Sequence, residues 1–242
     1  MSADDLRPLT PDGPLTPDGQ LMRDIVTWDV RTWSKAVLFW EKALGKPEGP
    51  LRCLEIGAGP GGPSLWLALQ GHDVLCTNWQ NTEEQAGPLH ERYGVSGRIE
   101  YRDVDATAIP YENEFGLVVF KSVIGGVGDR AAQDRAMAGV LRALKPGGRL
   151  IFAENLRGTW LHRLGRAIAY RLRRASWRYV TLSELRPHLA QYSQHELHTT
   201  GFAAVFGLTE GQRDALAIAD QRVFNRITPR AWQYVSYGTA IK

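Results

Sequence analysis

Residues 51–63 read Leu-Arg-Cys-Leu-Glu-Ile-Gly-Ala-Gly-Pro-Gly-Gly-Pro, a short apolar run that ends in a glycine-rich turn. A helical pattern follows over 64–70, so the stretch predicts a strand, a turn with little side-chain bulk, and a helix that begins at the turn. Such a turn lets backbone N–H groups approach a ligand, and the start of a helix favours negative charge there. Alone, the pattern also fits a tight turn without a ligand.

Strand and helix patterns alternate from residue 51 onward. Helical patterns cover 64–70 and 131–144, and the strand candidates between and around them are 52–56, 73–77, 99–102, 117–120 and 149–153. This alternation predicts an α/β fold with an open, mostly parallel sheet covered by helices on both faces. Two late strand candidates, 203–208 and 234–241, flank a polar helix near 210–225. We expect a Rossmann-like, seven-stranded sheet whose last strand is antiparallel.

Length and composition are those of one well-buried domain with some additions. The chain has 242 residues, 43% of them hydrophobic, with a formal net charge of +3, which does not by itself imply a nucleic-acid partner. No apolar run approaches the roughly 18–20 residues needed to span a bilayer, and the N-terminus does not resemble a secretory signal. Cys53 and Cys76 fall in apolar strand patterns, so we expect buried free thiols and a cytoplasmic location.

The ends of the predicted strands carry the polar side chains. In open parallel sheets a ligand binds beyond the carboxyl ends of the strands. Those ends offer Glu55, then Asn78 about twenty residues further on, where a ribose-binding side chain is expected. The later ends offer Asp105, Lys121 and Glu154. We therefore expect one ligand site built from these positions.

Four segments resemble the class I S-adenosylmethionine-dependent methyltransferases in order and spacing, and together they span roughly 50–155. They are Leu54-Glu-Ile-Gly-Ala-Gly-Pro-Gly-Gly62, Asp105-Ala-Thr-Ala-Ile-Pro-Tyr111, Phe115-Gly-Leu-Val-Val119 and Val140-Leu-Arg-Ala-Leu-Lys-Pro-Gly-Gly-Arg149. The resemblance implies the Rossmann-like fold and S-adenosylmethionine as the cofactor. It divides the chain into a flexible tail (1–20), a helical cap (21–50) and a methyltransferase domain (51–242), with 156–200 as a substrate-shaping lid.

The resemblance also implies which residues hold the cofactor. Asp105 would accept from the adenine amino group, with Trp79 and Ile109 beside the ring. Asn78 would hold the ribose, and here the chain departs from the acidic residue that the family usually has. An uncharged amide would weaken cofactor binding by about tenfold. Gly116 is a second departure, at a position where the family commonly shows aspartate. The complete predicted cofactor site comprises Glu55, Gly57, Ala58, Gly59, Gly61, Asn78, Trp79, Asp105, Ala106 and Lys121.

Three side chains are candidates for catalysis. An oxygen acceptor needs its proton removed, so we look for a base near the fourth and fifth strand ends. Lys121, Glu154 and His162 are the candidates. Each has a plainer interpretation: a surface lysine, the start of a helix, and an exposed histidine. The remaining histidines show no spacing typical of a metal site, so none is expected.

The segment 157–178 contains seven arginines and no acidic residue. It reads as a basic amphipathic helix that meets an anionic substrate, a membrane surface or an acidic carrier, or else as an ordinary helix whose apolar side packs on the core. Tryptophans would wall an apolar or ring-shaped acceptor pocket, unless they only pack in the core. They are Trp28, Trp33, Trp40, Trp160 and Trp177.

The sequence therefore predicts methyl transfer to a small molecule, most simply O-methylation of a sugar or secondary metabolite. Methylation at nitrogen or carbon of a small molecule or macromolecule is an alternative, although no nucleic-acid-binding module or base-methylation motif is present. The glycine spacing of 57–62 also allows a nicotinamide-dependent oxidoreductase. A catalytically silent scaffold is the last alternative, prompted by Asn78.

Overall fold

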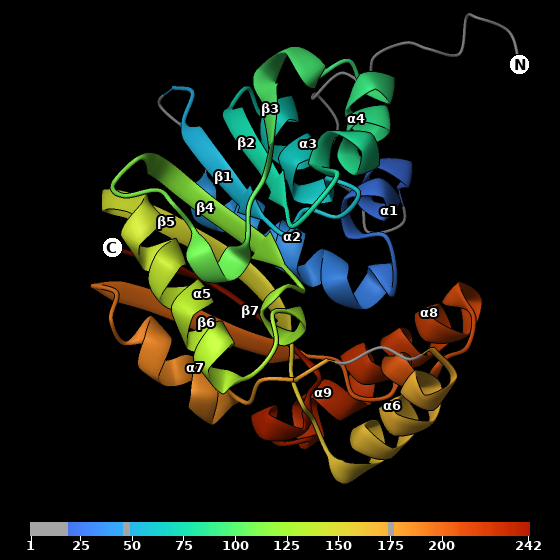
Figure 1. The fold of residues 1–242 in the computed structure, drawn as a ribbon. Coiled ribbons are helices and arrows are strands. Elements are labelled where there is room, and N and C mark those ends of the chain that lie inside the picture. The colour runs from blue at the N-terminus through green and yellow to red at the C-terminus, as the bar shows by residue number, and fades with distance from the viewer. Residues whose placement is uncertain (1–18, 46–48, 174–176) are drawn as a thin grey trace, which may run out of the picture.

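One seven-stranded sheet forms the centre of the protein (Figure 1). The computed structural model describes residues 19–45, 49–173 and 177–242. The strand order is β3-β2-β1-β4-β5-β7-β6, and only β7 runs antiparallel to its two neighbours. The strands are β1 (Arg52–Ile56), β2 (Asp73–Asn78), β3 (Ile99–Asp103), β4 (Phe115–Lys121), β5 (Leu144–Asn155), β6 (Gln194–Thr200) and β7 (Val235–Ile241). The predicted Rossmann-like fold with an antiparallel last strand is confirmed.

Helices cover both faces of the sheet because successive strand side chains point to opposite sides. In β1, Cys53 joins the apolar core beneath the N-terminal helices, whereas Leu54 joins the core beneath α5 and α7. Both cysteines are buried free thiols, as expected. The helices are α1 (Gln20–Val26), α2 (Val30–Leu44), α3 (Gly62–Leu69), α4 (Thr82–Arg92), α5 (Arg130–Ala143), α6 (Trp160–Arg173), α7 (Leu182–Leu189), α8 (Glu210–Ala219) and α9 (Asn225–Ile227).

The predicted strand over 203–208 is wrong, because the sixth strand is 194–200 and a single 3-10 turn follows it. Gly201 turns the chain with a φ of +78°. The Asp220 carboxylate then accepts hydrogen bonds from the backbone N–H groups of residues 202–204, so those groups cannot join a sheet. The true strand is a polar edge strand, which lacks the apolar alternation that identifies a strand in sequence.

The N-terminal helical pattern divides into α1 and α2 at residues 27–29. Asp29 has a left-handed φ of +47°, and its carboxylate accepts a hydrogen bond from the Tyr234 hydroxyl. α1 packs against α3, and α2 packs against β5 and β7 of the sheet, with Met22 and Trp33 fully buried. The predicted flexible tail covers residues 1–20, of which 1–18 lie outside the described residues, while Gln20 already begins α1. Within the described ranges, no helix has the length and apolar character to cross a bilayer.

Candidate active site

The turn after β1 brings two strand ends close together at Gly57. Gly57 has a φ of +65°, and a Cβ at this position would lie 2.6 Å from a methyl carbon of Val123. The position therefore requires glycine for two reasons, its backbone conformation and the close approach of the loop after β4. Gly57 lines a cavity at this edge of the sheet, which places it where the sequence predicts a ligand.

The other residues of the glycine turn mainly pack against protein. The Ala58 N–H donates to the carbonyl oxygen of Thr77 at 2.8 Å, so it is not available to a ligand. His90 fills the space in front of Gly61, and its Nε2 lies 2.8 Å from the Gly61 carbonyl oxygen. Gly59 alone has open space around its Cα. Of the turn residues predicted to bind the cofactor, Gly57 and Gly59 are thus the ones whose surroundings leave space for a ligand.

Glu55 is buried behind the turn and holds the start of α3. Its Oε2 accepts hydrogen bonds from the Ser64 N–H at 2.8 Å and from the Ser64 hydroxyl at 2.5 Å. Burial raises the pKa of this carboxyl to about 7, although the Ser64 bonds oppose the change. Its predicted contact with the amino end of a cofactor remains a prediction.

The donor cavity, as we name the space beyond β1, β2 and β3, has a volume of about 450 Å³. Asp105 lies in its wall and accepts from the Thr107 N–H and hydroxyl, both at 2.8 Å. These bonds lower the pKa of Asp105, so the side chain is an ionised acceptor at neutral pH. Its lining comprises Gly57, Asn78, Trp79, Val104, Asp105, Ala106, Thr107, Ser122, Val123, Gly126, Val127, Ala132, Arg135 and Trp177.

The predicted adenine neighbours separate in the structure. Trp79 lines the donor cavity with 70% of its surface exposed, which leaves a free aromatic face beside Asp105. Ile109 is instead buried in the core against Gly139 of α5, so its predicted contact with the ring is wrong. Ile109 belongs to the helix-packing face of its segment because the 3-10 turn over 106–108 rotates it inward.

Lys121 and Glu154 both tie other segments to the carboxyl edge of the sheet. The Lys121 Nζ donates to the Val26 carbonyl oxygen at 3.1 Å and lies 5.7 Å from the centre of the Trp33 ring. Burial lowers the pKa of Lys121, and Glu55 and Glu154 oppose this decrease. Lys121 was predicted to lie at the pocket mouth, but its side chain contacts the N-terminal helices instead.

Glu154 is fully buried and accepts three backbone hydrogen bonds, from Val123 and Ile124 to Oε2 and from Asn155 to Oε1. Burial raises its pKa to about 7, while these N–H donors oppose a further rise. Glu154 therefore fixes the loop after β4, so it is a positioning residue in this geometry. Glu154 is not among the residues that line the donor cavity, so its predicted role in catalysis stays a prediction.

A second space, the acceptor cavity, lies beside the first and has a volume of about 570 Å³. The two cavities share Ser122 and Trp177. Of the predicted tryptophans, Trp28 and Trp177 line it, Trp33 and Trp40 are core residues, and Trp160 is exposed outside it. Its lining comprises Trp28, Ser122, Asn155, His162, Gly165, Arg166, Trp177, Tyr179, Val205, Phe206, Gly207, Leu208 and Arg213.

His162 lines the acceptor cavity but is not exposed, contrary to the plainer expectation for it. Its Nδ1 accepts from the Thr159 N–H at 3.0 Å, so Nε2 carries the proton and donates to the Phe202 carbonyl oxygen at 2.8 Å. Burial lowers the pKa of His162, which favours the neutral ring. Both nitrogens are engaged, so the ring orients α6 and has no free nitrogen for a proton transfer.

Ser122 is a site residue that the sequence reasoning missed. It adopts a left-handed φ of +58°, which is uncommon for a residue with a side chain, at the junction of the two cavities. The Asn155 Nδ2 donates to the Ser122 Oγ at 2.6 Å. Its hydroxyl hydrogen is therefore left for a second partner. Only its place directly after the fourth strand pointed to it in the sequence.

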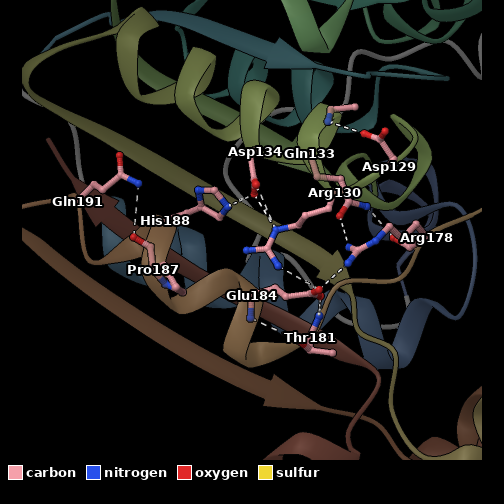
Figure 2. A network of polar contacts seen from close by, with 11 residues as sticks. Asp129, Arg130, Gln133, Asp134, Arg178, Thr181, Glu184, Pro187, His188 and Gln191 are labelled. Carbon is pink, nitrogen blue, oxygen red and sulfur yellow. Dashed lines mark hydrogen bonds and ion pairs between the residues drawn. The ribbon is translucent and has the colours of Figure 1, made fainter.

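A polar network anchors the segment that carries Trp177 (Figure 2). Arg178, the next residue, donates to the carboxylate of Glu184 and to the side chain of Gln133 on α5. Although burial opposes it, the bond from Arg178 lowers the pKa of Glu184 to about 2. Arg130 donates to the same carboxylate at 3.2 Å. These bonds hold Trp177 against Gly125 and Gly126, between the two cavities.

Comparison with known proteins agrees with this geometry. Residues 54–152 match the family model described as a methyltransferase domain. The chain is 27% identical over 118 residues to the demethylmenaquinone methyltransferase of Clavibacter sepedonicus, covering 48% of this chain and 46% of that protein. It is 29% identical over 175 residues to the ubiquinone/menaquinone biosynthesis C-methyltransferase UbiE of Acidiphilium cryptum, covering 71% and 65%. The match thus spans less than two thirds of either relative.

The match identifies a methyltransferase domain over residues 54–152, which supports the predicted class I S-adenosylmethionine-dependent methyltransferase. A solved structure with the same fold is phosphoethanolamine N-methyltransferase 2 of Haemonchus contortus in complex with S-adenosyl-L-methionine. Its TM-score is 0.61 at 17% identity, over 87% of this chain and 52% of that one.

The donor cavity fits an adenosyl group. An ionised acceptor, Asp105, and an exposed aromatic face, Trp79, lie side by side in its wall, together with the Asn78 amide. An adenosyl group offers an amino donor, a flat ring and ribose hydroxyls, which match these three side chains. Within the described ranges, no group of three His, Cys, Asp or Glu side chains is arranged to hold a metal ion.

Asn78→Asp is expected to tighten S-adenosylmethionine binding about tenfold, because a carboxylate bonds ribose hydroxyls more strongly than an amide. In the free protein the Asn78 Nδ2 donates to Gln85 at 3.1 Å. Isothermal titration calorimetry measures the change. Asn81→Asp is the control, since it adds the same charge at an exposed position nearby. Equal affinities of the wild type and Asn78→Asp would contradict a ribose contact.

Proposed function

We propose that this protein transfers a methyl group from S-adenosylmethionine to a hydroxyl oxygen of a small, ring-shaped secondary metabolite. The observation that carries the proposal is the junction of the donor and acceptor cavities at Ser122 and Trp177. Methyl transfer is an in-line displacement that needs the two reacting atoms within about 3–3.5 Å. Two adjoining cavities of different chemistry supply such a meeting point.

When bound, S-adenosylmethionine supplies an electrophilic methyl group. The residues of this chain hold and orient the two reactants around it. Asp105 and Trp79 orient the donor, and Trp177 separates the donor cavity from the acceptor cavity. The Ser122 hydroxyl, oriented by Asn155, donates a hydrogen bond to an acceptor oxygen at the junction. Proximity of this kind contributes roughly 7–11 kcal/mol to lowering a reaction barrier.

The acceptor cavity favours an aromatic or enolic hydroxyl over a sugar. Among the described residues that line it, none is aspartate or glutamate, and its histidine has no free nitrogen. The acceptor must therefore ionise readily without a protein base, as a phenol or enol does. Trp28, Phe206 and Tyr179 offer aromatic faces, and the Arg166 guanidinium lies 3.6 Å from the centre of the Tyr179 ring. Cations beside these rings stabilise an acceptor anion.

Arg213 supplies a second cation in this cavity. Its Nη1 donates to Glu210 at 2.6 Å, whereas its buried Nε has no hydrogen-bond partner among the described residues. Its guanidinium also lies 5.8 Å from the centre of the Trp28 ring. Arg213 lines the acceptor cavity, so its positive charge favours the anionic form of the acceptor.

Methylation at carbon is the second candidate function. A phenolate or enolate carries negative charge on oxygen and on the neighbouring ring carbon, so one cavity suits both outcomes. The relative from Acidiphilium cryptum is named a C-methyltransferase, which favours this alternative.

The test uses S-adenosylmethionine with an isotopically labelled methyl group and a panel of phenols, enolic metabolites and sugars. We expect a mass increase of one methyl group on phenols or enols and none on sugars. NMR of the product distinguishes a methoxy group from a methyl on carbon. Methylation of sugars alone would overturn the acceptor class. Binding of NAD without binding of S-adenosylmethionine, measured by calorimetry, would overturn methyl transfer altogether.

Asp105→Ala is expected to weaken S-adenosylmethionine binding at least about tenfold, because a charged hydrogen bond to the adenine is lost. Calorimetry gives the affinity directly, without an acceptor. Glu112→Ala is the control, because this exposed acid lies outside the donor-cavity lining. An unchanged affinity in Asp105→Ala would show that this carboxylate only caps the turn over 106–108.

A further inference from the structure

The apolar side of α6 faces away from the protein. Trp160, Leu161 and Leu164 are 68%, 43% and 53% exposed. His162, on the opposite side of the helix, is buried and holds α6 to the Phe202 carbonyl oxygen. Figure 1 shows α6 at the periphery of the molecule, beyond the sheet. In its described part, the expectation that the apolar side packs on the core is therefore not met.

Two further exposed apolar residues lie on the turn after β6. Phe206 is 42% exposed and stacks on the His162 ring at a centroid distance of 5.1 Å, and Leu208 is 86% exposed. Both residues line the acceptor cavity, as does Gly165 of α6. We call Trp160, Leu161, Leu164, Phe206 and Leu208 the apolar rim. It lies beside the space proposed to receive the acceptor.

Arginines accompany the apolar rim. Arg157, Arg163 and Arg166 line a shallow depression of about 350 Å³ along α6. Between residues 157 and 178 the sequence contains seven arginines and no acidic residue. A surface that combines exposed tryptophan and leucine with several arginines is complementary to an anionic bilayer, whose headgroups are negative and whose acyl boundary is apolar.

We propose that α6 and the apolar rim dock this protein on an anionic lipid surface, with α6 lying in the plane of the interface. An acidic protein would satisfy the arginines but would not require exposed tryptophan and leucine on the same helix. At a bilayer, by contrast, both groups are satisfied at once. Docking does not depend on which atom receives a methyl group.

The first test measures co-sedimentation of the full chain with vesicles of phosphatidylcholine, with and without 30 mol% phosphatidylglycerol, a lipid fraction of roughly the order found in anionic membranes. We expect binding to the anionic vesicles, weakening as salt increases, and little binding to phosphatidylcholine alone. Leu161→Ser/Leu164→Ser should reduce the partition coefficient at least about tenfold. No binding of the wild type, or undiminished binding of this double variant, would overturn the proposal.

The second test reverses one charge. Arg163→Glu should weaken binding to anionic vesicles at least about fivefold, because each arginine near the surface contributes attraction of that order. Lys145→Glu also replaces a positive charge with a negative one, at an exposed position near the amino end of β5. This control should have little effect on vesicle binding. Equal losses in both variants would indicate net charge alone and overturn the proposal. So would a dimer in sedimentation velocity that Leu161→Ser/Leu164→Ser dissociates, because a second copy would then cover the rim.

Discussion

Gly62→Ala is expected to lower the melting temperature by about 2–12 °C and to weaken S-adenosylmethionine binding. A Cβ on Gly62 would lie 2.1 Å from the carbonyl oxygen of Ile25, far inside contact distance. Backbone cannot move aside as the end of a long side chain can, so α1 must shift from α3. Overpacking of this kind costs about 1–3 kcal/mol or more, and each kcal/mol shifts the melting temperature of a chain of this size by about 2–4 °C.

The weaker S-adenosylmethionine binding is expected because α1 contacts the end of β4. Ile25 and Val26 are buried, and the Val26 carbonyl oxygen accepts the hydrogen bond from Lys121 at the end of β4. A shift of α1 therefore reaches the strand end that precedes Ser122. Gly87→Ala is the matched control, because its Cβ would lie 3.8 Å from the nearest side-chain atom, in a helix. An equal melting temperature for Gly62→Ala and wild type would contradict this account.

The parts of the fold that sequence reveals are those with a local cause. The strand, glycine turn and helix over 51–70 were predictable because hydrophobic period and turn residues change within a few positions. β6 was not, because an edge strand such as Gln194–Thr200 has one polar face and few apolar residues. The incorrect strand over 203–208 had the composition of a strand, but Asp220, sixteen or more residues away, takes its N–H groups.

The site divides in the same way. Residues that belong to family motifs, such as Gly57, Asn78 and Asp105, lie around one cavity as expected. The candidates chosen for their chemistry, such as Lys121 and Glu154, form hydrogen bonds to backbone of distant segments. No sequence pattern reports such bonds, because backbone acceptors and donors are present at every position. Arg213 reaches the acceptor cavity from α8 for a similar reason: only the tertiary fold brings it there.

Glu154→Ala is expected to have the larger effect on the site itself. The substitution leaves the N–H groups of Val123, Ile124 and Asn155 buried without their acceptor. Each unsatisfied group costs about 1–3 kcal/mol, so the free energy of unfolding should fall by about 3–9 kcal/mol. The freed loop also carries residues of both cavities, and S-adenosylmethionine affinity should drop at least about tenfold. Chemical denaturation and calorimetry measure the two effects, with exposed Glu196→Ala as the control.

Glu154→Gln keeps the shape of the side chain and reports on its charge. Because burial raises the Glu154 pKa to about 7, above the ordinary 4.5, the folded protein retains a proton that the unfolded chain releases. The contribution of Glu154 to the free energy of unfolding of the wild type therefore falls as pH rises from about 4.5 to 7. Glutamine does not titrate, while Asp29 and Glu55 titrate in both proteins. The free energy of unfolding of Glu154→Gln should thus lie further below that of the wild type at pH 5 than at pH 8. A difference between the two proteins that does not change with pH would show that burial does not raise this pKa.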